Sequence, residues 1–104
     1  MEDMKKNLKA AITSIEITSK YFNQNKIAEG YKQLEDTIAK IDNIVCITSA
    51  YRQQGLEIEI NEAKLMESLQ EAMTALENKD TLLVSDILEY EVKELLEHNL
   101  QTLL

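Results

Sequence analysis

The sequence predicts an all-α protein, a four-helix bundle of two antiparallel helical hairpins. Through most of the 104 residues apolar side chains recur every three or four positions, the period of a helix with one buried face. The chain has no proline and only two glycines, so it lacks the corner residues that barrels and sandwiches need. Two short asparagine-containing segments, residues 23–25 and 78–80, interrupt the apolar pattern. Each is expected to be the turn of one hairpin.

The first hairpin is expected to contain helices at residues 4–22 and 26–53. Their apolar stripes are formed by Met4, Leu8, Ala11, Ile15, Thr18 and Phe22, and by Ile27, Tyr31, Leu34, Ile38, Ile41, Val45 and Thr48. Asparagine tolerates the left-handed backbone at a helix end and also caps a following helix, which favours a tight turn at residues 23–25. Gly30 lies inside the second helix, where glycine costs about 1 kcal/mol relative to alanine. We interpret Gly30 as the site of a close helix crossing.

The second hairpin is expected to contain helices at residues 62–77 and 81–101. Asn61 is a suitable N-cap for the third helix, and Asp80 or Thr81 for the fourth. The stripes are formed by Leu65, Leu69, Ala72 and Leu76, with Met66 and Met73 alongside, and by Val84, Ile87, Leu88, Val92, Leu95 and Leu96. All four helices are assigned to one domain, residues 1–104.

The link between the two hairpins is ambiguous. Gly55 is well placed to end the second helix. Residues 56–60 then alternate apolar and polar side chains, a strand-like period without an obvious partner strand. The favoured interpretations are an extended connector that presses Leu56, Ile58 and Ile60 onto the bundle, or an early turn of the third helix.

The charge of the chain, −8 in total, is concentrated in its second half. Residues 1–52 carry eight cationic and seven anionic side chains, whereas residues 53–104 carry three and twelve. An acidic surface repels phosphate backbones and anionic membranes, so nucleic acid and membranes are not expected partners. A basic protein partner is favoured.

The N-terminal residues and the single cysteine predict a cytoplasmic protein. Residues 1–9 are charged and polar, and neither a signal peptide nor an apolar run of about 20 residues follows them. Cys46 has no second cysteine with which to form an internal disulfide. Because it stands in the apolar run 44–47, we expect a buried and unreactive thiol.

The inventory of chemically active residues predicts no enzyme, no cofactor and no metal. The one histidine and the one cysteine allow a single dyad, Cys46 with His98, and His98 is better interpreted as a surface cation near a helix end. A glycine-rich phosphate-binding loop is missing. Glu94 and His98 form at most one half of a di-iron site, which needs two such pairs and two further glutamates.

The fourth helix carries the residues that we predict to bind a partner. Tyr90 stands between two glutamates, and tyrosine is favoured at the centres of protein interfaces. The leucines near the C-terminus either close the bundle or present an apolar patch to another chain. The predicted site has Tyr90, Leu96, Leu100 and Leu103 as apolar anchors and Glu91 and Glu94 as an acidic rim.

Two segments of the second hairpin resemble known proteins. They are Ala-Leu-Glu-Asn-Lys-Asp at residues 75–80 and Asp-Ile-Leu-Glu-Tyr-Glu-Val-Lys-Glu-Leu-Leu-Glu at residues 86–97. The stretch is similar to one in small helical bacterial proteins, some of them encoded near flagellar genes. It also resembles the small flagellar export chaperones, which hold the amphipathic helix of an export substrate. The resemblance implies an interaction role and carries no functional residue over.

These observations favour a non-enzymatic helical interaction module, chaperone-like or adaptor-like, that binds an amphipathic helix of a partner. An apolar strip between helices would hold that helix, and the acidic rim would select basic partners. The alternative is a homo-oligomeric structural protein whose exposed apolar residues are covered by self-association.

Overall fold

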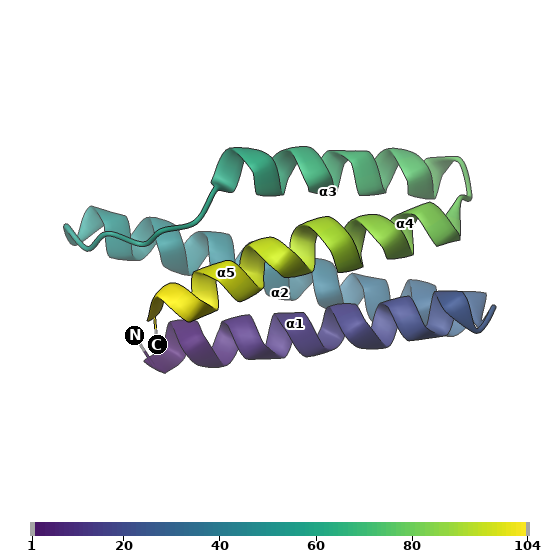
Figure 1. The fold of residues 1–104 in the computed structure, drawn as a ribbon, viewed down its shortest axis with the longest axis horizontal. Coiled ribbons are helices and arrows are strands. Elements are labelled where there is room, and N and C mark those ends of the chain that lie inside the picture. Colours follow the sequence, from purple (N-terminus) through teal and green to yellow (C-terminus); the bar gives the residue numbers. More distant parts are fainter. Residues whose placement is uncertain (1, 104) are drawn as a thin grey trace.

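The computed structural model describes residues 2–103, which form the predicted four-helix bundle (Figure 1). The elements are α1 (Glu2–Asn23), α2 (Ile27–Gln53), α3 (Glu62–Glu77) and a fourth rod built from α4 (Thr81–Ile87), the π-helical turn η1 (Leu88–Val92) and α5 (Lys93–Leu103). The ends of the four helical rods differ from the expected ones by at most two residues. The long dimension of 43 Å matches the roughly 40 Å expected for the 27 residues of α2.

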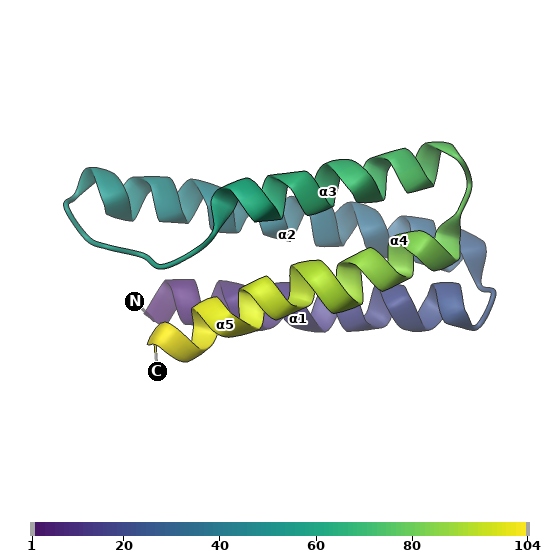
Figure 2. The same ribbon diagram turned by 45° about the horizontal axis from the view of Figure 1, so that its top comes forward.

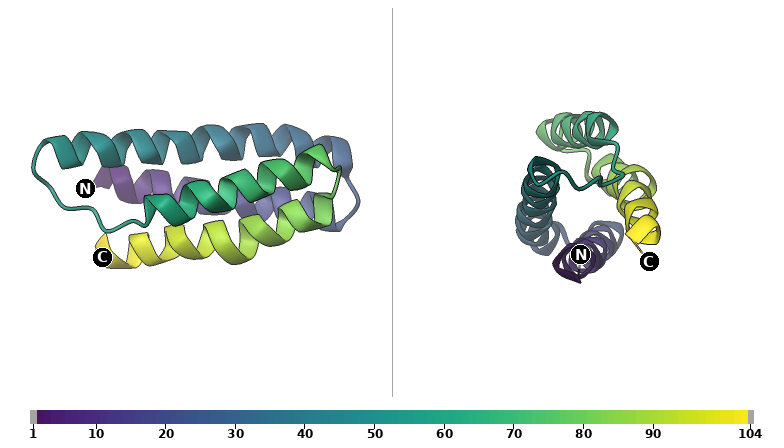
Figure 3. Two further views of the ribbon diagram at one scale, coloured as in Figure 1. Left: turned by 90° about the horizontal axis from the view of Figure 1, so that it is seen from above. Right: turned by 90° about the vertical axis from the view of Figure 1, so that its left-hand side faces the viewer.

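Successive helices run antiparallel and enclose a common core (Figures 2 and 3). Helix α1 packs closely against α2 and against the fourth rod, and α3 packs closely against α4 and η1. Helices α2 and α3 face each other without the close backbone approach of these pairs. Within residues 2–103, no helix combines the length and the apolar composition that crossing a bilayer requires.

The helix ends follow the signals in the sequence. The side chain of Asn61 accepts a hydrogen bond from the backbone N–H of Lys64 at 3.0 Å, and that of Asp80 accepts one from Leu83 at 3.1 Å. The two hairpin turns place Asn25 and Lys79 in the left-handed region, with φ of 60° and 58°. Both expected N-caps are therefore confirmed, and Asp80 rather than Thr81 caps the fourth rod.

Residues 56–60 form neither strand nor helix, so the extended connector is the correct alternative. Ile58 is buried in the core, but Leu56 is 43% exposed, and the expectation that Leu56 presses onto the bundle is wrong. Two side chains hold the connector in place. The guanidinium of Arg52 donates to the carbonyl of Ile58 at 3.3 Å, and Asn99 Nδ2 donates to the carbonyl of Glu59 at 2.6 Å.

Gly30 marks a close approach between α1 and α2. A Cβ at this position would overlap the ring of Phe22, which is buried. The same ring packs edge-on against Tyr31, with 5.7 Å between the ring centroids. The close crossing inferred at Gly30 is therefore confirmed, and the neighbour that requires it is the Phe22 side chain.

The expected burial of Cys46 is wrong, because its side chain is exposed. Helix α2 buries Ile41, Ile44 and Thr48, a stripe with steps of three and four residues. Cys46 lies two residues beyond Ile44, and two residues turn a helix by more than half a circle. The apolar run 44–47 wraps around the helix, so only part of it reaches the core.

Candidate functional site

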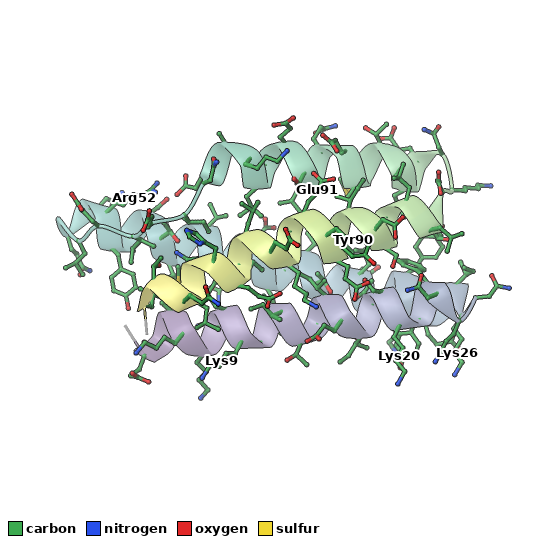
Figure 4. All side chains as sticks on the ribbon, viewed as in Figure 1. Lys9, Lys20, Lys26, Arg52, Tyr90 and Glu91 are labelled. Carbon is green, nitrogen blue, oxygen red and sulfur yellow. The ribbon has the colours of Figure 1, made fainter. Side chains whose placement is uncertain are left out.

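The fourth rod departs from regular α-helix at η1. There the backbone hydrogen bonds span five residues, as in a π-helix, and not the four of an α-helix. Leu88 and Val92, at the two ends of η1, are buried in the core. Tyr90 lies between them on the opposite side and is 65% exposed, the highest fraction among the large hydrophobic side chains of the described residues (Figure 4). Turns of π-helix are frequent at functional sites, and η1 contains two residues of the predicted site, Tyr90 and Glu91.

A shallow depression of about 310 Å³ lies beside Tyr90. It is lined by Lys64, Tyr90, Glu91, Glu94, Leu95 and His98. Glu91 Oε1 accepts a hydrogen bond from Ser68 Oγ at 3.0 Å and lies 3.8 Å from Lys64 Nζ. The structure therefore brings together three of the six residues of the predicted site, Tyr90, Glu91 and Glu94.

The other three predicted anchors lie elsewhere. Leu96 is fully buried, so its place on a binding surface is a wrong prediction. Leu100 and Leu103 are half-buried and pack against the core. The reason is that α5 lies against the beginning of α1, which covers the apolar stripe where α3 does not extend (Figure 1).

Met66 and Met73 are exposed apolar residues that the predicted site did not include. They are 55% and 42% exposed and lie seven residues apart on α3, which places them on the same side of the helix. Their position alongside the α3 stripe is visible in the sequence. Their exposure becomes clear only in the packed bundle, where α3 buries Leu65, Ser68, Ala72 and Ala75 instead.

A second polar cluster lies between α1 and α2. Ser14 Oγ is within 2.7 Å of Thr37 Oγ1 and donates to Asp36 Oδ2 at 2.9 Å. Thr18 Oγ1 lies 2.9 Å from Thr37 Oγ1, and Lys40 Nζ pairs with Asp36 Oδ1 at 2.6 Å. The three hydroxyl residues are buried and satisfied by one another, so this cluster fixes the pairing of the two helices.

The arrangement of this cluster does not suit nucleophilic chemistry. The hydrogen bonds from Lys40 and then from Ser14 lower the pKa of Asp36. A carboxylate with a lowered pKa is a weak general base. Ser14 is also only 2% exposed, which leaves its hydroxyl out of reach of a substrate.

The lowered pKa of Asp36 predicts a pH-dependent contribution to stability. The contribution is present above the ordinary pKa of 3.8 and is lost as the pH falls through the lower value in the folded protein. Asp36→Asn should therefore lower the melting temperature at pH 7 more than at pH 2. Thermal unfolding followed by circular dichroism measures both values, and Asp42→Asn, which changes an exposed aspartate outside the cluster, is the control. An equal effect of Asp36→Asn at the two pH values would show that the charge of Asp36 does not stabilise the folded protein.

The two residues of the only possible cysteine–histidine dyad, Cys46 and His98, lie on different elements. Cys46 is exposed on α2, and His98 lines the depression beside Tyr90 on α5. Helices α2 and α5 are not among the closely packed pairs. Residues 2–103 contain no group of three or more histidine, cysteine, aspartate or glutamate residues placed to hold a metal ion.

Comparison with known proteins places the chain in a family. No curated protein and no solved structure matches the sequence. A family model described as "Domain of unknown function (DUF8042)" matches residues 1–101, which is almost the whole chain. The chain belongs to the DUF8042 family.

Proposed function

We propose that this protein is a non-enzymatic interaction module that binds an amphipathic helix of a partner protein. The observation that carries the proposal is Tyr90, an aromatic side chain that is 65% exposed beside a depression on a rigid helical rod. Tyrosine is enriched at interface hot spots because it offers a large contact area with few rotatable bonds. Tyr90 stands on η1 between the buried residues Leu88 and Val92, which anchor this turn in the core while the ring faces solvent.

The charges around Tyr90 support a basic residue in the partner helix. Glu91 is already engaged by Lys64 and Ser68. Glu94 is exposed and makes no ion pair within residues 2–103. A lysine or arginine of the partner would contact both the Glu94 carboxylate and the face of the Tyr90 ring.

The finer form of the proposal is a chaperone-like or adaptor-like role. It is supported by the resemblance of residues 75–97 to small helical bacterial proteins and flagellar export chaperones. Tyr90, Glu91 and Glu94 all fall within that segment. A chaperone of this kind would cover the apolar face of its partner helix until the partner is used.

We expect Tyr90→Ala to weaken binding of the partner helix by roughly thirtyfold, the equivalent of about 2 kcal/mol for a hot-spot residue. Partners would be isolated from the native cell on the tagged wild-type chain, and the segment that binds would be synthesised and titrated by fluorescence anisotropy. Ile17→Ala removes a partly exposed apolar side chain from α1 and is the matched control. Equal affinity of wild type and Tyr90→Ala for the segment would overturn the proposed site.

Self-association is the second candidate function. It is favoured by the exposed apolar residues of the second hairpin, Met66, Met73, Leu82 and Leu83. A chain that buried them against a second copy would have less exposed apolar surface for a partner. The mass in solution distinguishes the two functions.

A further inference from the structure

A second surface, on the opposite side of α3 from Tyr90, combines apolar and acidic side chains. Helix α3 turns Ser68 toward the fourth rod, where the serine hydroxyl reaches Glu91. Leu69 and Leu76 lie on the other flank of α3, toward α2, and Met66 and Met73 lie farther out on the same flank. Leu69 and Leu76 are half-buried against the core, whereas Met66 and Met73 are exposed, so the outer part of this flank is accessible.

Helix α2 contributes the facing half of an apolar strip. One flank of α2 faces α1, where Asp36, which is paired with Lys40, accepts a hydrogen bond from Ser14. Figure 3 shows α2 running beside α3. The helical spacing places the half-buried Tyr31 and Ile38 on the flank of α2 away from Asp36, and the Tyr31 ring also contacts Phe22 of α1. We call the combined surface the Met strip, formed by Tyr31, Ile38, Met66, Leu69, Met73 and Leu76.

The chemistry of the Met strip suits a helix as its occupant. Methionine side chains are flexible and polarisable, and they adapt to the irregular surface of an incoming helix. Met66 and Met73 are separated by seven residues, which is two helical turns. An amphipathic helix laid beside α3 presents apolar residues at the same interval.

Carboxylates flank the Met strip. Glu35 and Asp42 are exposed on the outer side of its α2 half, and Glu77 is exposed on the outer side of its α3 half. None of the three makes an ion pair within residues 2–103. Lys32 of α2 lies on the flank toward α1, where it lines a depression together with Tyr21 and Asp36. The rim of the strip is therefore acidic.

The acidic rim argues against a second copy of the chain as the occupant. A two-fold contact through the strip would bring the acidic rim of one copy, with Glu35, Asp42 and Glu77, against the acidic rim of the other, and like charges repel. The basic side of the chain is the outer face of α1, where Lys9 and Lys20 point away from the bundle (Figure 4). Ile17 is the one large hydrophobic residue of α1 with substantial exposure, at 38%, which is too little apolar surface to cover the strip.

We infer that the Met strip is a docking surface for a basic amphipathic helix of another protein. The apolar face of that helix would cover Met66 and Met73. Lysine or arginine residues on its flanks would pair with Glu35, Asp42 and Glu77. This surface is separate from the Tyr90 site, because the two lie on opposite flanks of α3 and share no residue.

The inference can be tested with a designed peptide and the purified chain. The probe is a fluorescein-labelled peptide of about 18 residues, five helical turns, with leucines on one face and lysines on the other. The control peptide has the same composition in a scrambled order that has no apolar face. Fluorescence anisotropy measures the affinity of each peptide for the wild type, for Met66→Ser/Met73→Ser and for the control Ile17→Ala.

The wild type should bind the amphipathic peptide at least about tenfold more tightly than the scrambled one. Met66→Ser/Met73→Ser should reduce that preference, the remainder being binding at the Tyr90 site, and Glu35→Lys/Asp42→Lys should weaken binding of both peptides. Ile17→Ala, which shortens an exposed apolar side chain of α1 outside both surfaces, should leave the preference unchanged. All four substituted positions of the strip and rim are exposed, so the variants should keep the circular dichroism spectrum of the wild type.

Three results would overturn the inference. The first is equal affinity of the wild type for the two peptides, which would show charge attraction without a docking surface. The second is an unchanged preference in Met66→Ser/Met73→Ser. The third is a concentration-dependent increase in the mass of the free chain that this double variant abolishes, which would show that the occupant is a second copy.

Discussion

Replacing Leu96 by alanine should lower the free energy of unfolding by about 2–5 kcal/mol, the usual cost of removing a fully buried leucine. Leu96 has no exposed surface and lies where α5 packs on α1. The truncated side chain would leave a cavity that the surrounding helices fill only in part. Urea unfolding followed by circular dichroism measures the change.

Leu100→Ala and Tyr90→Ala are the matched controls for Leu96. Leu100 is half-buried, so its truncation should cost less than that of Leu96. Tyr90 is largely exposed, and its replacement should change stability by about 0.5 kcal/mol or less. If Leu96→Ala weakened partner binding while leaving the stability unchanged, Leu96 would belong to the surface after all.

Replacing Gly30 by valine should lower the free energy of unfolding by about 1–3 kcal/mol, the usual cost of overpacking a core. The branched side chain would occupy the space of the buried Phe22 ring. Valine has a higher helix propensity than glycine, and this favourable term reduces the loss only in part. Thermal and urea unfolding of the purified variant measure the net effect.

A double-mutant cycle identifies the cause of the Gly30 effect. Phe22→Leu shortens the side chain that a residue at position 30 would meet. The double variant Gly30→Val/Phe22→Leu should lose less stability than the sum of the two single variants, because the smaller side chain leaves room for valine. Strict additivity would show that the ring of Phe22 is not what excludes a side chain at Gly30.

The bundle was predictable because the local signals agree with the fold. The 3/4 spacing of apolar residues and the capping residues Asn61 and Asp80 mark the helices and their ends. The π-helical turn was not predictable in the same way. Ile87, Leu88, Val92, Leu95 and Leu96 together also supply the steps of three and four residues of a regular helix, so the apolar pattern does not reveal the extra residue.

Which flank of a helix is buried was harder to predict. On α2 the apolar spacing predicted that Ile38 and Val45 belong to the buried stripe. Both are only half-buried, whereas Thr37 and Ile44 are fully buried. Thr37 can occupy a core position because the hydroxyls of Ser14 and Thr18 satisfy its own. A single sequence does not reveal such a partner on another helix.

The candidate site was predictable only in part, for a related reason. Tyr90, Glu91 and Glu94 are neighbours along one helical rod, so local spacing is sufficient to group them. The burial of Leu96 depends on α1, and the exposure of Met66 and Met73 depends on which side of α3 faces the core. Both are properties of the packed bundle.

The mass of the purified chain in solution tests the central claim most directly, because both proposed surfaces must be free in the isolated protein. Multi-angle light scattering at micromolar concentrations and physiological salt should give the mass of one chain, 11.9 kDa. Tyr90→Ala and Met66→Ser/Met73→Ser should give the same mass. A wild-type mass of twice that value, reduced to one chain by either variant, would contradict the account. It would show that the chain covers these surfaces with a second copy of itself.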